Sequence, residues 1–128
     1  MINRDIYTNA LALLSQNISG EFCEDLEERA PYLLANFCRE ALELDKLIRS
    51  LSGLSAHGSF NGVFLDLDAD FPLRDRIASV AAKYLAAMLI IDENSDLSDR
   101  LYDAYCDAMA TIQCSIPSVV EKIKNNYL

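Results

Sequence analysis

Apolar residues recur every three or four positions in several stretches of the chain, which is the spacing of one face of an α-helix. The first stretch runs from Asn3 to Ser15, and Asn3 stands where a polar side chain can cap the start of a helix. Turn-forming residues at positions 17–20 interrupt the pattern. A first amphipathic helix is therefore predicted, with its apolar face formed by Ile6, Tyr7, Ala10, Leu11, Leu13 and Leu14.

Two further helices are predicted before residue 53. A short acidic helix spans Glu21 to Arg29, and Pro31 then suits the first turn of a long helix, where its missing N–H is no loss. Gly53 is the usual residue just past a helix and ends the long one near Leu51. The wide apolar stripe of the long helix indicates more than one neighbour: Leu33, Leu34, Phe37, Cys38, Ala41, Leu42, Leu44, Leu47, Ile48 and Leu51.

Between residues 54 and 70 the helical period is lost. Gly, Ser, His and Asn interrupt this segment, and apolar and acidic residues alternate from Phe64 onward. We interpret residues 54–70 as a long loop with an extended arm. Because long non-helical insertions in small helical domains often carry binding, the arm is a candidate partner-contact surface. Its candidate contact residues are Phe60, Val63, Phe64, Leu65, Asp66, Asp68 and Asp70.

The helical period returns after the arm. A third major helix is predicted from Pro72 to Ile91, and its many apolar and alanine positions mark it as the centre of the core. Ser95 or Asp96 is placed to cap a fourth helix that reaches about residue 115. Pro117 then restarts the chain into a last helical turn or two. The pattern predicts an all-α fold, a small bundle of about four to five helices with the arm between the second and third major helices.

Composition supports one folded domain over residues 1–128. The 128 residues are 52% hydrophobic and 24% charged, enough apolar material for a single core without crosslinks. The formal net charge of −9 disfavours direct binding to nucleic acid or to anionic membranes. The stretch 77–91 is too short to span a bilayer, and the first residues lack a secretory signal, so a cytoplasmic location is expected.

Acidic residues gather in the predicted short helix. Glu24, Asp25, Glu27 and Glu28 are interpreted as an exposed charged face that can select a basic partner surface. They are therefore the second candidate partner-contact surface. General acid–base catalysis is not expected from them, because catalytic carboxylate pairs need an apolar pocket to separate their pKa values.

The sequence offers no constellation for catalysis, so we expect a non-enzymatic protein without cofactor or metal. His57 is the single histidine and falls in the predicted loop, which excludes an evident triad. Asp92 to Asp96 resembles part of a calcium loop, but Leu97 stands where Gly is required. Cys38 and Cys106 lie on apolar helical faces and are predicted to be buried thiols.

Three stretches carry a resemblance to a known family. They are ERAPYLLANFC at residues 28–38, DFPL at residues 70–73 that ends the arm, and AAKYLAAML at residues 81–89, followed by Ile91, Asp92 and Glu93. Together, over residues 28–112, they resemble small helical proteins of tailed phages and prophages, of the head–tail connector or head-completion type.

The resemblance implies a virion-assembly role in the bacterial cytoplasm or the virion. It implies partners such as the portal or neighbouring virion proteins, a homo-oligomeric ring, and an arm that reaches a neighbouring subunit. The alternative hypothesis is an intracellular helical adaptor or regulator, which binds a partner protein through the acidic helix or the C-terminal tail.

Overall fold

The computed structural model describes residues 1–14, 20–51, 53 and 62–115, and for residues 20–24 it describes the backbone alone. This part of the chain contains four α-helices, which are α1 (Asn3–Leu13), α2 (Gly20–Leu51), α3 (Asp75–Ile90) and α4 (Ser95–Cys114). One isolated antiparallel bridge pairs Ile2 with Asp70. The predicted all-α class, a small helical bundle, is confirmed.

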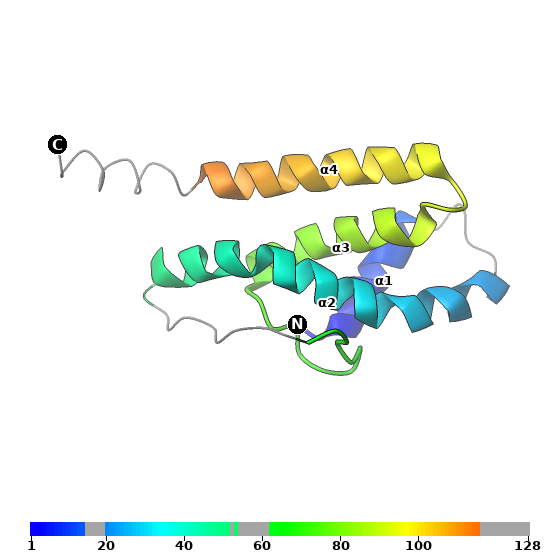
Figure 1. Cartoon of the computed structure of the whole chain (residues 1–128), viewed down its shortest axis with the longest axis horizontal. Helices are drawn as coiled ribbons and strands as arrows, with labels where there is room; N and C mark the ends of the chain where they lie inside the picture. The colour runs from blue at the N-terminus through cyan, green and yellow to red at the C-terminus, as the bar shows by residue number, and fades with distance from the viewer. Residues whose placement is uncertain (15–19, 52, 54–61, 116–128) are drawn as a thin grey trace.

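Helix α3 is the centre of the bundle. It packs on each of the other three helices, and Figure 1 shows it between α2 and α4. Its alanines allow this close approach, because small side chains bring helix axes together. The prediction that this helix forms the centre of the core is confirmed by its buried residues, which are Ile77, Ala78, Val80, Ala81, Ala82, Tyr84, Leu85, Ala86, Ala87, Leu89 and Ile90.

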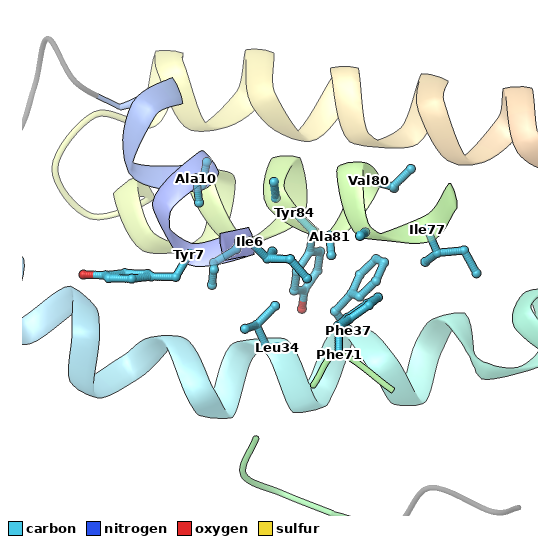
Figure 2. Close-up of a cluster of buried hydrophobic side chains, with 14 of the residues drawn as sticks. Ile6, Tyr7, Ala10, Leu34, Phe37, Phe71, Ile77, Val80, Ala81 and Tyr84 are labelled. Atoms are coloured by element: carbon cyan, nitrogen blue, oxygen red, sulfur yellow. The ribbon is translucent and has the colours of Figure 1, made fainter. Parts of the chain in front are cut away.

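The core is filled by apolar side chains from α1, α2 and α3. Figure 2 shows Ile6 of α1, Leu34 and Phe37 of α2, and Ile77 of α3 in one cluster. Phe71, from the segment before α3, belongs to the same cluster. Burying each such side chain contributes about 2 kcal/mol to stability. This cluster fixes the relative positions of the helices that carry the site described below.

Helix α2 is continuous, so the prediction of two separate helices is wrong. Pro31 lies inside α2 and is buried. Its ring removes one intrahelical hydrogen bond, the one that the carbonyl of Glu27 would accept. The good helix-forming residues on both sides of Pro31 continue the helix through this position. The carbonyl of Pro31 accepts a hydrogen bond of 3.1 Å from the backbone N–H of Leu65, which attaches the arm to α2.

The predicted helix caps also needed correction. Ile2, not Asn3, precedes α1, and the buried Asn3 side chain donates a hydrogen bond of 2.8 Å to the carbonyl of Asp66. Helix α4 is capped by Asn94, not by Ser95 or Asp96, because the Asn94 side chain accepts a hydrogen bond of 3.0 Å from the N–H of Leu97. A tertiary contact thus engages the side chain predicted to cap α1, whereas a local contact of the preceding residue caps α4.

The start of α3 also differs from the prediction. The helix begins at Asp75, three residues after Pro72, and Arg74 precedes it without a capping hydrogen bond from its own side chain. The backbone N–H of Arg74 instead donates a hydrogen bond of 2.9 Å to the side chain of Asp45 in α2. The partner of this N–H is thus supplied by another helix.

Helix α4 covers one side of α3 and leaves much of its own surface exposed (Figure 1). Ser98, one of its few buried residues, donates a hydrogen bond of 2.9 Å to the carbonyl of Ala87 in α3. Tyr105 packs against Phe37 and Tyr84, with ring centroids 6.1 and 5.3 Å away. Cys106, the next residue, is exposed, so its predicted burial is wrong.

Candidate partner-binding site

The candidate site lies where the arm meets the middle of α2. Asp25, Glu27 and Glu28 of α2 are exposed, as predicted for the acidic face. Tyr32 follows Glu28 by four residues, so the two side chains share one side of the helix. Tyr32 is 56% exposed, although aromatic side chains bury more area than most others when they are covered. This side of α2 therefore presents carboxylates and an aromatic ring together.

The described part of the arm, residues 62–70, lies along α1 and α2 and is held by backbone hydrogen bonds. At the start of α1, the N–H of Asn3 donates a hydrogen bond of 2.9 Å to the carbonyl of Ala69. The N–H of Arg4 donates one of 2.7 Å to the carbonyl of Leu67. These N–H groups have no partner within their own helix, because they belong to its first turn. Together with the Leu65–Pro31 hydrogen bond, they fix the arm at two helices.

The arm places Phe64 against Tyr32. The two ring centroids are 5.2 Å apart with an angle of 72° between the ring planes, an edge-to-face arrangement. Phe64 is 51% exposed and the preceding Val63 is 62% exposed. Leu67 of the same segment, by contrast, is buried. Leu67 therefore faces inward and Phe64 outward, although residues 66–69 form a turn, closed by a hydrogen bond of 3.1 Å from the N–H of Ala69 to the carbonyl of Asp66, where an extended segment was predicted.

An open cleft forms around the aromatic pair. Its volume is about 570 Å³. The lining residues come from α2 and from the arm, two segments that are distant in sequence, and they are Glu27, Glu28, Arg29, Pro31, Tyr32 and Phe64. We call this site the Tyr32–Phe64 cleft.

Ion pairs surround the cleft and tie its two walls together. The Arg4 guanidinium lies 2.9 Å from Asp68 of the arm and 2.9 Å from Glu27 of α2. These hydrogen bonds, first with Asp68 and then with Glu27, raise the pKa of Arg4 above its ordinary value. Arg29 lies 3.7 Å from Asp25 and donates 3.4 Å to the carbonyl of Met88 in α3. Both guanidinium groups next to the cleft are therefore already engaged.

The structure brings together members of both predicted contact surfaces. Phe64 from the arm and Glu27 and Glu28 from the acidic helix line one cleft. The other predicted contact residues do not line this cleft: Leu65 is half-buried, and the exposed ones are Asp25, Val63, Asp66, Asp68 and Asp70. Phe60 and the side chain of Glu24 lie outside the described residues, as do His57, the side chain of Cys23 and the predicted C-terminal turn.

Sequence reasoning missed Tyr32, Arg4 and Pro31 as parts of this site. Tyr32 could have indicated this site, because it is a large aromatic residue outside the apolar stripe of α2 and lies four residues from Glu28. No local pattern pointed to Arg4, because its partners Glu27 and Asp68 lie in other segments of the chain.

The described residues show no arrangement typical of metal chemistry. They contain no group of three or more His, Cys, Asp or Glu side chains placed to bind a metal ion. Asp92 and Glu93 are exposed, and Asn94 of the same turn caps α4. Cys38 is buried as predicted, and this burial raises the pKa of its thiol to about 12. In the same part of the chain, no helix combines the length and apolar character that a membrane span requires.

The chain matches no known protein family, no curated protein sequence and no solved structure.

Proposed function

We propose that this chain is a non-enzymatic protein that works by binding another protein at the Tyr32–Phe64 cleft. The observation that supports the proposal is the edge-to-face pair of half-exposed rings, Tyr32 and Phe64, inside a cleft. Aromatic side chains in such positions are enriched among the residues that dominate protein–protein binding energies. A partner that covers both rings gains their apolar area, which water now contacts.

The rigid attachment of the cleft supports the same proposal. Phe64 is held by the hydrogen bond between Leu65 and Pro31, and the arm is held by Arg4. A site that is ordered before binding loses little conformational entropy when a partner arrives. This arrangement favours binding by a preformed surface.

The particular role proposed for the protein is virion assembly, as a head–tail connector or related structural component in a bacterial cytoplasm or a virion. This role rests on the resemblance of residues 28–112, and its partners are portal or neighbouring virion proteins. The alternative role is an intracellular adaptor that uses the same acidic part of α2. Both roles need a protein-binding surface, and they differ in the partner.

The test measures molar mass by light scattering for the protein alone and mixed with the portal protein encoded nearest to its gene. We expect ring-sized oligomers or a mixed complex. The Phe64→Ser and Tyr32→Ser variants are expected to weaken the complex by about thirtyfold, the loss typical of a dominant interface residue. Leu47→Ser is the matched control, because Leu47 is an exposed apolar residue of α2 outside the lining of the cleft.

The light-scattering results test the proposed role and the proposed binding site separately. An inert monomer under both conditions contradicts the connector role and favours the adaptor. A complex that Phe64→Ser, Tyr32→Ser and Leu47→Ser all leave unchanged contradicts the assignment of the cleft as the binding site.

A further inference from the structure

We infer that the Tyr32–Phe64 cleft binds a basic segment of the partner, with an arginine or lysine side chain against the two rings and beside Glu28. This inference rests on the proposed function and specifies the chemistry of the partner. Three features of the described residues support it: the charge around the cleft, the exposed ring faces, and the lack of an ion pair at Glu28.

Carboxylates outnumber guanidinium groups around the cleft. The carboxylates belong to Asp25, Glu27, Glu28 and Asp68, and the guanidinium groups to Arg4 and Arg29. The whole chain carries a formal net charge of −9 in addition. A cationic partner is therefore attracted at long range, and nearby carboxylates offset the charges of Arg4 and of Arg29, which itself lines the cleft.

The ring geometry offers a face to a cation. In an edge-to-face pair, the edge of one ring covers part of one face of the other and leaves the opposite face out of the contact. Tyr32 and Phe64 retain about half of their surface exposed in this arrangement. A guanidinium or ammonium group within about 6 Å of a ring centroid is attracted by the electron-rich face. The cleft thus provides the aromatic component of a cation site.

Glu28 provides the carboxylate component. Within the described part of the chain, Glu27 is paired with Arg4, and Asp25 with Arg29, whereas Glu28 forms no ion pair. Glu28 lies four residues before Tyr32 and lines the same cleft. A basic side chain of a partner can therefore contact this carboxylate and the ring of Tyr32 at the same time, without displacing an existing pair.

The test uses fluorescently labelled peptides of alternating arginine and serine. A counterpart in which citrulline replaces each arginine keeps the shape and removes the charge. We expect the arginine peptide to bind, the citrulline peptide to bind much more weakly, and added salt to weaken arginine binding, since screening acts on exposed charges. Fluorescence anisotropy measures the dissociation constants for the intact chain.

Matched variants separate the ring from the carboxylate. Tyr32→Leu is expected to weaken binding of the arginine peptide about threefold, whereas Tyr32→Phe, which keeps the ring, leaves it unchanged. Glu28→Gln is expected to weaken binding about threefold. Asp99→Asn changes the net charge equally at an exposed position of α4 and is expected to have no such effect.

The inference is overturned if arginine and citrulline peptides bind equally, if neither binds, or if Asp99→Asn weakens binding as much as Glu28→Gln does. It is also overturned if Tyr32→Leu has no effect. If Phe64→Ser abolishes a partner complex in light scattering while the arginine peptide fails to bind, the cleft is the binding site and its occupant is not basic. The two proposals therefore fail in distinguishable ways.

Discussion

The carboxylate of Asp45 in α2 accepts a hydrogen bond of 2.9 Å from the backbone N–H of Arg74, the residue that precedes α3. The other oxygen of this carboxylate accepts a hydrogen bond of 2.8 Å from Nε of Arg49. The same guanidinium group donates a hydrogen bond of 3.4 Å to the carbonyl of Pro72. Asp45 is fully buried. A negative charge at the start of a helix interacts favourably with the helix dipole. Asp45 therefore joins α2 to the beginning of α3.

Replacement of Asp45 is expected to destabilise the fold. Asp45→Ala removes both hydrogen bonds and leaves Arg49 without its carboxylate, which lowers the free energy of unfolding by about 3 kcal/mol. Asp45→Asn keeps an acceptor for the Arg74 N–H and is expected to lower it less. Urea denaturation measures both. Glu43→Ala is the control, because this exposed carboxylate of α2 forms a surface ion pair with Lys46; an equal effect at Glu43 would contradict the role of Asp45.

Arg4 is expected to hold the arm in place more than it stabilises the whole fold. Arg4→Met keeps a long side chain and a similar helix propensity, and removes the ion pairs with Asp68 and Glu27. Amide hydrogen exchange in residues 62–70 is expected to become faster, because the arm loses a contact to α2. Lys46→Met removes an exposed ion pair elsewhere on α2 and is expected to leave this exchange unchanged. Unaltered exchange in both variants would show that backbone hydrogen bonds alone retain the arm.

The cysteines are expected to differ in reactivity. Burial raises the pKa of the Cys38 thiol to about 12, so little thiolate forms at neutral pH and reagents cannot reach it. Cys106 and Cys114 are exposed. With iodoacetamide, the folded protein is expected to be modified at Cys106 and Cys114 and not at Cys38, as read by peptide mass spectrometry. Denaturant should make Cys38 reactive, and modification of Cys38 without denaturant would contradict its burial.

Alkaline pH is expected to destabilise the protein through Tyr105. Burial raises the pKa of Tyr105 from 10.0 to about 12, with a smaller contribution from Glu40. Above pH 10 the unfolded chain releases this proton while the folded chain retains it, so the free energy of unfolding falls until the pH reaches about 12. Urea denaturation at increasing pH is expected to show a shallower fall for Tyr105→Phe. Tyr32→Phe, at an exposed tyrosine, serves as control and should match the unaltered protein.

Periodicity predicted most of the helical residues and the central position of α3. It is a local signal, and it located α3 and α4 because their apolar positions face neighbours along the whole helix. It failed at Pro31, where the good helix-forming residues on both sides continue the helix through the proline. It also failed at Cys106, because α4 contacts α3 along one side only.

The candidate site was predictable only in parts. The acidic residues and Phe64 were identified from composition and alternation, yet no rule of sequence spacing places Phe64 beside Tyr32. That placement depends on Asn3 and Arg4, whose partners are residues 66–69. Contacts between segments so distant in sequence leave no local pattern, which is why Asp45 was also missed.

The anchoring of the arm by Asn3 has a consequence for protein synthesis. Asn3 and Asp66 are separated by 63 positions, so a chain emerging from the ribosome has the acidic face of α2 long before it has the residues that close the cleft. Contacts of such long sequence separation also form late when a domain folds. The complete cleft therefore exists only in chains that have been synthesised beyond residue 66, and a partner that needed both of its walls would not bind shorter nascent chains.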